Sequence, residues 1–365
     1  MLKVHIRPHW EISFSGEPPL DTAALLGLLL AIHDTGSIAQ AAKAVALSYR
    51  YAWGLLRDAE QLFGERLLET GRGRGTILTP LAQKLVWADR RIAARLSPTL
   101  ESLASELENE LSKVMQAGLH TIRMDASHGF AVAALTGHLN RIELPVELRY
   151  RGCGDAVAAL SRRECDLAGF HAPVGRFEQP TVSWYMRWLD PNQHCLVNIA
   201  SREQGLFVAR GNPLEVRGLA DLVRPEVRFV NRQVGSGTRM LLEMMLAADG
   251  ISPDAINGYN SAEFTHSAVA AYIASGMADV GIGVRTAAER FNLDFIPLAR
   301  ERYFFALRTD ALDEPLMQQL VTVLQQGDYH RLVDALPGYD ASNTGKIESV
   351  TQAFGAAAQH ASNTP

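Results

Sequence analysis

From Thr121 onward, short apolar runs alternate with helix-like segments, and this alternation constrains the fold of the 365-residue chain more than any other feature. The runs end in turns of small or hydroxyl residues, at Ser127, at Gly152–Gly154 and at Gly235–Thr238, and a helical pattern follows each turn. Strands that alternate with helices favour parallel sheets with ligands at the carboxyl ends of the strands. The sequence therefore predicts an α/β domain over residues 119–340.

The sharpest of these turns lies in the segment Phe229–Leu246, which reads FVNRQVGSGTRMLLEMML. It lacks the Gly-Lys-Ser/Thr of a P-loop, and its glycines are too closely spaced for a dinucleotide fingerprint. What remains is a helix N-terminus whose N–H groups lie beside the hydroxyls of Ser236 and Thr238, a geometry that suits an anion. One such turn is often only a helix cap, but three in one domain favour a site for a negatively charged group.

The N-terminal third has a different pattern of short helices. Thr22–His33 predicts a first helix, Ser37 caps a second, and Ser48 caps a third over Tyr49–Phe63. Trp53 lies near helical spacing with Leu56 and Ala59; a core position is the commoner fate of a helix tryptophan, and a surface position is the alternative. Two short strands, Leu67–Glu69 and Thr76–Leu78, flank the glycine- and arginine-rich segment 71–75. The pattern predicts a helix-turn-helix followed by a basic wing.

Charge alone does not identify a DNA-binding surface in this part of the chain. The segment from Ser48 to Arg95 contains nine Arg/Lys and five Asp/Glu, and a solvated helical bundle could have the same surplus of positive charge. The stretch GSIAQAAKAVALSYRYAWGLL, however, resembles the winged helix-turn-helix of ModE-type regulators and, more distantly, of the LysR type. The resemblance covers about residues 20–95 and implies that these residues face DNA: Ser37, Gln40, Ser48, Tyr49, Arg50, Arg57 and, in the wing, Arg72 and Arg74.

A long helix is expected next, from Leu81 to about Gln116, with Pro98 as a kink or break. Its apolar residues recur at steps of four and three, which suits pairing with a second copy of the chain, although a helix packed on its own domain is the alternative. We expect a homodimer or higher homo-oligomer. The predicted organisation is a winged helix-turn-helix (1–80), a linker and dimerisation helix (81–118), an α/β sensor domain (119–340) and a flexible tail (341–365).

The α/β part resembles the type II periplasmic-binding-protein-like domains, of the molybdate- and tungstate-binding type. The matching stretches include DLAGFHAP, RFVNRQVGSGTR and ASGMADVGIGVRTAAE. The resemblance implies two lobes around a cleft, one of about 119–198 and 295–340 and the other of about 199–294. It implies a ligand site at these residues, the last three on weaker grounds: Ser127, His128, Gly152, Cys153, Arg232, Gly235, Ser236, Gly237, Thr238, Arg239, His171, His266 and Tyr303. Arg239 has the alternatives of bridging the lobes or pairing with an acid.

The residue at position 234 limits the range of anions that the turn is expected to bind. In the phosphate-binding pattern an aspartate two residues before the serine accepts the proton of the anion, and this chain has Val234 there. A fully deprotonated anion such as molybdate, tungstate or sulfate is therefore favoured over hydrogen phosphate, and a small carboxylate remains open.

Several classes of protein are disfavoured. The three cysteines have no CxxC spacing and predict neither disulfides nor a metal site. No nucleophile–base pair, HExxH or paired-carboxylate spacing indicates an enzyme, and no cofactor is expected. The N-terminus lacks the apolar stretch of a signal peptide, which predicts a cytoplasmic protein without a membrane partner. The sequence predicts a ligand-responsive, DNA-binding transcriptional regulator; the alternative is a repressor or architectural protein whose ligand-less sensor-like domain serves oligomerisation.

Overall fold

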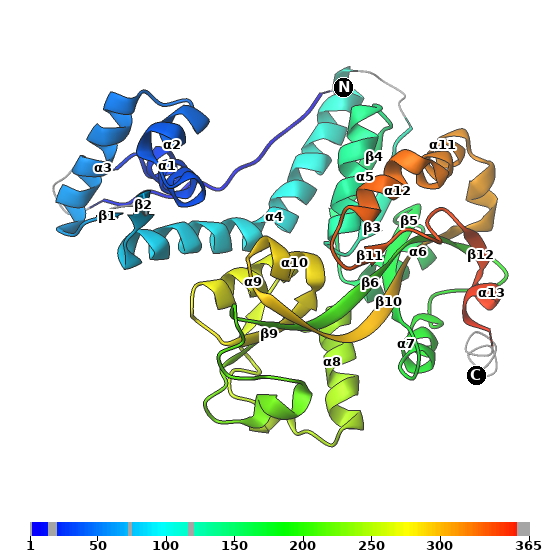
Figure 1. Ribbon diagram of the computed structural model, residues 1–365. Coiled ribbons are helices and arrows are strands. Elements are labelled where there is room, and N and C mark those ends of the chain that lie inside the picture. Colours follow the sequence, from blue (N-terminus) through cyan, green and yellow to red (C-terminus); the bar gives the residue numbers. More distant parts are fainter. Residues whose placement is uncertain (1, 14–19, 72–74, 116–119, 356–365) are drawn as a thin grey trace. The chain divides into compact units, whose positions relative to one another are not determined.

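A computed structural model describes residues 2–13, 20–71, 75–115 and 120–355, and the chain divides into two compact units (Figure 1). One unit is Arg7–Leu96 and the other is Met1–Ile6 together with Ser97–Pro365. The first unit holds α1 (Thr22–Thr35), α2 (Ile38–Ala44), α3 (Tyr49–Phe63), β1 (Leu68–Gly71) and β2 (Gly75–Leu78). Among the described helices, none has both the length and the apolar character that a membrane span requires.

Local capping explains where the helices of the first unit begin. The side chains of Asp21, Ser37 and Ser48 accept hydrogen bonds from the backbone N–H groups of the first turns of α1, α2 and α3. Such caps satisfy donors that a helix leaves free at its start. Gly36 ends α1 in the left-handed region, at φ 65°, where glycine has no steric penalty. The paired strands β1 and β2 form the wing, and Arg72 and Arg74 lie outside the described residues.

The expected core position of Trp53 is wrong. The buried face of α3 consists of Ala52, Leu55, Leu56 and Ala59, at the i, i+3, i+4 and i+7 spacing of a helix face. Trp53 follows the first of these by one residue, a turn of about 100° around the helix, and its side chain is 49% exposed.

The helix α4 (Pro80–Met115) continues through Pro98 instead of ending there. The last residue of its expected range, Gln116, lies outside the described residues. Four leucines along α4 are at least 40% exposed: Leu96, Leu103, Leu107 and Leu111. Their spacing of seven, four and four places them along one face, which we call the leucine stripe of α4.

The second unit is built on one mixed sheet with the strand order β4-β3-β5-β10-β6-β9-β7-β8. Its strands are β3 (Ile122–Ala126), β4 (Val146–Tyr150), β5 (Leu167–Pro173), β6 (His194–Val208), β7 (Phe229–Arg232), β8 (Ala262–Glu263), β9 (Val280–Val284), β10 (Asp294–Arg308), β11 (Tyr339–Asp340) and β12 (Ile347–Ser349). Its helices are α5 (Phe130–Arg141), α6 (Cys153–Ser161), α7 (Glu178–Tyr185), α8 (Gly237–Ala248), α9 (His266–Ala274), α10 (Arg285–Arg290), α11 (Pro315–Gln325), α12 (Gly327–Asp334) and α13 (Val350–Phe354).

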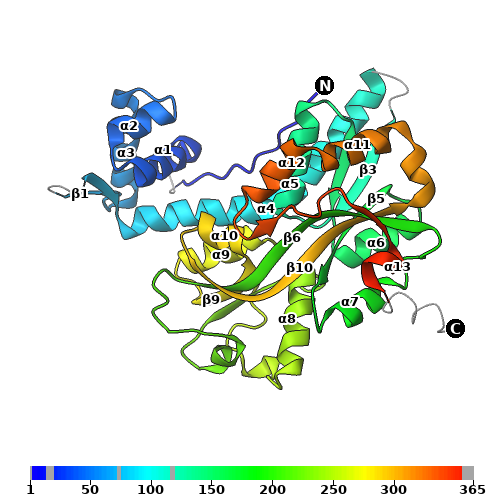
Figure 2. The same ribbon diagram turned by 45° about the vertical axis from the view of Figure 1, so that its right-hand side comes forward.

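Two long antiparallel strands, β6 and β10, run side by side through the whole sheet, as both views show (Figure 1, Figure 2). On one side β10 pairs with β5, and β3 and β4 follow in the sheet. On the other side β6 pairs with β9, and β7 and β8 follow. We call the first half lobe 1 and the second half lobe 2. The expected lobe boundaries at 198/199 and 294/295 therefore fall at or within continuous strands rather than in loops.

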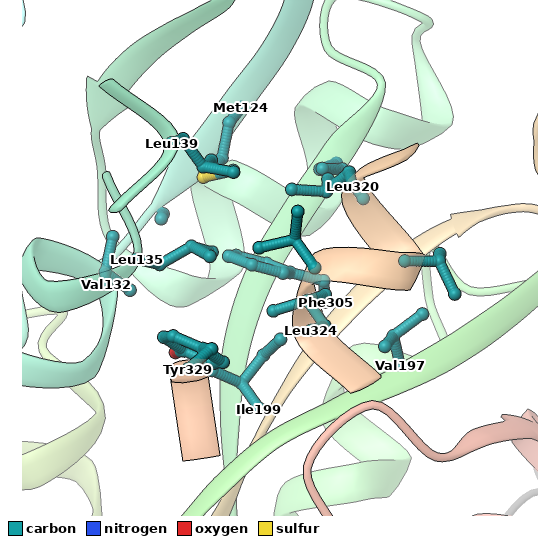
Figure 3. Close-up of a cluster of buried hydrophobic side chains, with 14 of the residues drawn as sticks. Met124, Val132, Leu135, Leu139, Val197, Ile199, Phe305, Leu320, Leu324 and Tyr329 are labelled. Carbon is teal, nitrogen blue, oxygen red and sulfur yellow. The ribbon is translucent and has the colours of Figure 1, made fainter. Parts of the chain in front are cut away.

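Alternation along β10 separates two hydrophobic cores in lobe 1. Tyr303, Phe305 and Leu307 face one core, while Phe304 and Ala306 face the other, because successive side chains of a strand point to opposite faces. In the first core, residues of α5, α11 and α12 close over Phe305 (Figure 3). This packing fixes the strand ends from which the polar residues of lobe 1 project.

The expected flexible tail differs from the structure over residues 341–355. β12 pairs with β6, and α13 begins with a capping box between Ser349 and Gln352. Val350 and Phe354, one helical turn apart, are buried in the second core of lobe 1. These two apolar residues lie in a stretch rich in Ser, Asn and Gln, and the polar composition of that stretch concealed the helix. Residues 356–365 lie outside the described residues.

The first residues of the chain belong to the second unit. Lys3 Nζ lies 3.2 Å from Glu108 Oε2 and donates to Asn140 Oδ1 at 2.7 Å. The backbone N–H of Val4 donates to Glu108 Oε1 at 2.8 Å. We call residues 2–6 the N-terminal strap, since they attach to α4 and α5 before the chain enters the first unit.

Candidate functional site

Four helices of the second unit begin with polar or glycine residues near the division between the lobes. The N-caps of α5 and α6 are Gly129 and Gly152, whereas α8 is capped by Ser236 and α9 by Thr265. The sequence predicted the first three of these starts but not the start of α9. Helix N-termini carry free N–H donors and a partial positive charge, so this arrangement favours an anion.

Arg232, the last residue of β7, carries the buried positive charge of this region. Its Nη1 donates to His266 Nδ1 at 2.9 Å and its Nη2 donates to the Phe264 carbonyl at 2.9 Å. Its Nε is buried and has no hydrogen-bond partner among the described residues. Burial, followed by repulsion from Arg202, lowers the pKa of Arg232 to about 9. The guanidinium therefore donates to two neutral groups, and its remaining N–H donors are available to a ligand.

Two hydroxyls lie in the turn that follows Arg232. Ser236 Oγ accepts from the backbone N–H of Arg239 at 3.2 Å, and Thr238 Oγ1 accepts from Gln204 Nε2 at 2.9 Å. Both side chains are at least 90% buried. Since each hydroxyl accepts through its oxygen, its own O–H remains available as a donor.

A buried ion pair lies behind the turn, on the two long strands. Arg202 of β6 and Glu301 of β10 are directly opposite in the strand register, and Arg202 Nε donates to Glu301 Oε1 at 2.6 Å. Gln204 Nε2 also donates to Glu301 Oε1, at 3.0 Å. Burial alone would raise the pKa of Glu301, but the charge of Arg202 holds it below its ordinary value. Arg202 and Glu301 therefore offset each other's charge within the buried region.

Three histidines surround these groups in their neutral form. Burial lowers the pKa of His128 to about 4 and that of His171 to about 3, and it places the pKa of His266 well below the ordinary value. Arginine can only donate, so Nδ1 of His266 is the acceptor of the Arg232 bond and its proton resides on Nε2. His171 Nε2 lies 3.3 Å from Ser127 Oγ.

A small cavity of about 10 Å³ lies at the lobe 1 end of this cluster. This volume is about what one water molecule, or one oxygen atom of a ligand, occupies. Hydroxyl, imidazole and guanidinium groups line it together with backbone and apolar atoms: Ser127, Gly129, Ala131, Val132, His171, Arg202, Tyr303 and Tyr339.

The two lobes touch at their helix N-termini. A methyl group placed on Gly152 of lobe 1 would lie 3.4 Å from the Gly235 carbonyl of lobe 2, and one placed on Gly237 would lie 3.6 Å from Cys153 Sγ. Cys153 is buried, and burial raises the pKa of its thiol. The structure is thus a closed arrangement of the lobes, in which a methyl group at either glycine would be in van der Waals contact with the opposite lobe.

Most of the sequence-predicted ligand residues come together in this cluster, whereas the side chain of Arg239 is engaged by an acid. Arg239 Nε donates to Glu243 Oε1 at 3.0 Å, and its guanidinium lies over the Tyr259 ring, so it forms the acid pair that was one of its alternatives. Val234 is 80% exposed. Its side chain is directed to solvent, so its identity does not settle which anion the cluster would accept.

Sequence reasoning missed Arg202, Gln204 and Glu301. A signal was present, because Arg202 and Gln204 are polar residues two apart in β6 and therefore face the same side of the sheet. Their partner Glu301 is 99 residues from Arg202 in the chain. Only the antiparallel pairing of β6 with β10 brings the two together.

The residues predicted to face DNA that the structure describes lie at the surface of the first unit. Gln40, Ser48, Tyr49, Arg50 and Arg57 are exposed, and Ser37 is half-buried as the cap of α2. Arg57 lies beside its neighbour Asp58, at 3.1 Å. Within the described ranges, no group of three or more His, Cys, Asp or Glu side chains has the geometry to hold a metal ion.

Comparison with known proteins gives two matches to families. Residues 136–325 match the PBP superfamily domain, and residues 24–83 match the bacterial regulatory helix-turn-helix proteins of the lysR family. The chain is 33% identical over 228 residues to the uncharacterized protein YvgK of Bacillus subtilis (strain 168), covering 61% of this chain and 72% of YvgK. It is 29% identical over 145 residues to the molybdenum-pterin-binding protein MopB of Rhodobacter capsulatus, covering 39% of this chain and 53% of MopB.

Solved structures resemble the chain at low sequence identity. A mutant of OxyR from Corynebacterium glutamicum, with hydrogen peroxide bound, is 14% identical with a TM-score of 0.43, covering 86% of this chain and 94% of that one. A putative phosphate ABC transporter substrate-binding protein of Clostridium perfringens, with bound phosphate, is 10% identical with a TM-score of 0.46, covering 60% of this chain and 99% of that one.

Proposed function

The chain belongs to the PBP superfamily and carries a regulatory helix-turn-helix of the lysR family, and from this premise we propose that it senses a small anion between its lobes and binds operator DNA through its winged helix. It is a transcriptional regulator rather than an enzyme, because the lysR family is one of DNA-binding regulators. Operator binding requires the compartment that holds DNA, so the proposed location is the cytoplasm.

One observation carries the proposal of an anion: Arg232 is 6% exposed, and its hydrogen-bond partners among the described residues include no carboxylate. Burying an isolated charge is costly unless it is paired. A guanidinium has five N–H donors, of which two bind His266 and Phe264, so three remain for a ligand. A bound anion would supply the missing charge.

The surrounding groups favour a compact oxyanion or a carboxylate. The hydroxyls of Ser236 and Thr238 retain protons to donate, and the N–H groups at the start of α8 lie in the same turn. The cavity of about 10 Å³ beside Ser127 has space for an oxygen atom but not for a larger substituent. The hydroxyl, N–H and guanidinium donors would suit the oxygen atoms of molybdate, tungstate, sulfate or a small carboxylate. Because the name of MopB refers to molybdenum-pterin, molybdate is the first anion that we would test.

The leucine stripe of α4 supports a dimer. Four leucines, each at least 40% exposed along one helix face, would be buried by the same helix of a second chain. A two-fold dimer also matches the two half-sites of a palindromic operator.

The proposal is tested by thermal shift followed by calorimetry with molybdate, tungstate, sulfate, phosphate and small carboxylates. An anion at one hundred times its Kd stabilises the folded state by about 2.7 kcal/mol. At about 2–4 °C per kcal/mol for a unit of this size, we expect the melting temperature to rise by about 5–10 °C.

The control is Arg228→Ala. Arg228 directly precedes β7, and its guanidinium pairs with the carboxylate of Asp279 at 2.7 Å, near the protein surface. We expect this variant to bind the anion like the original protein, and Arg232→Ala to lose binding. If none of these anions raises the melting temperature, the ligand-less alternative gains support and the sensing proposal is wrong.

A further inference from the structure

The recognition helix α3 exposes two aromatic rings that contact each other. The side chain of Tyr49 is 54% exposed and that of Trp53 is 49% exposed. Their ring centroids lie 6.4 Å apart, with an edge-to-face angle of 76°. The residues are four apart, so they lie on the same face of the helix, one turn above the other.

This aromatic face is separate from the surface that holds the first unit together. Ala52, Leu55 and Leu56 supply the core of α3, and Tyr49 and Trp53 are not among the residues of that core. Tyr51 is also an exposed aromatic residue, but its hydroxyl donates to Asp21 Oδ2 at 3.1 Å. The contact between Tyr51 and Asp21 links α3 to the start of α1, whereas the rings of Tyr49 and Trp53 are presented to solvent.

The cationic residues on α3 identify what would cover these rings. Arg50 follows Tyr49 directly, and Arg57 follows Trp53 by one helical turn, both with exposed side chains. A face that combines apolar rings with arginines suits the major groove, where phosphates flank the base edges. The apolar group offered by a base edge in that groove is the 5-methyl group of thymine.

We propose that Tyr49 and Trp53 contact thymine 5-methyl groups in the major groove of the operator, an inference that rests on the proposed binding of operator DNA. The 6.4 Å between the ring centroids is close to two base-pair steps of about 3.4 Å each. The two rings therefore reach methyl groups on base pairs up to two steps apart. Arg50 supplies the neighbouring polar contact, and the aromatic pair adds a preference for thymine beside it.

The experiment uses a duplex selected from random sequences by the full-length protein. Each thymine of that duplex is replaced in turn by uracil, which pairs identically but lacks the methyl group. At one or two positions we expect the affinity to fall about fourfold, because one buried methyl group is worth about 0.8 kcal/mol and a tenfold change is 1.4 kcal/mol. For Trp53→Ala or Tyr49→Ala, the thymine and uracil duplexes should bind equally at the corresponding position.

Tyr51→Phe is the matched control, since it changes an exposed aromatic residue of the same helix outside the pair, and it should retain the uracil effect. Thermal melting of all variants checks that the unit remains folded. Uracil duplexes that bind the original protein as tightly as thymine duplexes would overturn the proposal while leaving DNA binding intact. An equal uracil effect in the original protein and in both alanine variants would also overturn it. A protein that selects no duplex would overturn the operator-binding proposal and this inference together.

Discussion

The substitution of Arg232 by alanine gives the sharpest test of the sensor site. The guanidinium lies in a buried region with two neutral partners, His266 and the Phe264 carbonyl, and with three N–H donors left for an anion. Removing one member of a buried, hydrogen-bonded charge pair costs roughly 2–5 kcal/mol. At 1.4 kcal/mol per tenfold change, the affinity for the anion should fall about thirtyfold or more.

Ligand-free stability should respond differently. Without a ligand, the charge of Arg232 has no carboxylate among its described hydrogen-bond partners to offset its burial, so its removal relieves the cost of burying an unpaired charge. Arg232→Met fills a similar volume without a charge, so its ligand-free melting temperature should remain near that of the original protein. Arg228→Ala, on the same side of lobe 2, should melt lower and keep its affinity because the ion pair with Asp279 is lost.

The assay is isothermal titration of each variant with the anion that the thermal screen identifies, together with melting curves without ligand. If Arg232 serves only to hold the end of β7, both Arg232 variants will melt at lower temperature and bind the anion with unchanged affinity. That combination would refute the reasoning. DNA binding by the ligand-free protein should survive in both variants, whereas the response to the anion should be lost.

Further predictions follow from the same structure. Thr238→Val keeps the shape of the turn but removes a donor, so calorimetry should show a smaller loss of affinity, about 0.5–1.5 kcal/mol; a loss as large as that of Arg232→Ala would contradict this. Leu103→Glu combined with Leu107→Glu should produce monomers in sedimentation, and a variant that stays dimeric would place the interface elsewhere. His171 has a pKa of about 3 and His266 one well below its ordinary value, so below about pH 6.5 the unfolded chain binds protons that the folded chain does not. Urea unfolding should therefore show stability falling as the pH is lowered through this range, approaching about 1.4 kcal/mol per pH unit for each histidine, and an unchanged midpoint between pH 7 and pH 5 would show that these imidazoles are protonated in the folded state.

Features set by neighbouring residues could be predicted from the sequence. The helices of the first unit follow their serine and aspartate caps, and the turn at Gly235–Thr238 opens α8 as its glycine and hydroxyl residues indicate. The alternation of strands and helices indicated the α/β class, and the resemblance to periplasmic-binding-protein-like domains implied the two lobes. In each case the pattern lies within a few residues, where backbone preferences and periodicity act directly.

Features set by distant segments could not be predicted in the same way. The ion pair of Arg202 and Glu301 depends on the register of two strands nearly a hundred residues apart. Placing Trp53 in the core relied on approximate helical spacing, and a shift of one residue moves a side chain out of the buried face. The helix α13 was missed because two apolar residues, Val350 and Phe354, fix a segment whose average composition is polar.

The N-terminal strap has a consequence for exchanging the two units between proteins. Residues 2–6 belong to the sensor unit, and so do the residues from Ser97 onward, so the DNA-binding unit is inserted into the sequence of the sensor rather than added at its end. A chimera joined at residue 97 alone would discard Lys3 and Val4 and leave the carboxylate of Glu108 without their hydrogen bonds. It would also replace two covalent attachments with one, which releases a chain end whose conformational freedom the native chain restricts. A functional transplant of this winged helix therefore requires two junctions, one near residue 6 and one near residue 97.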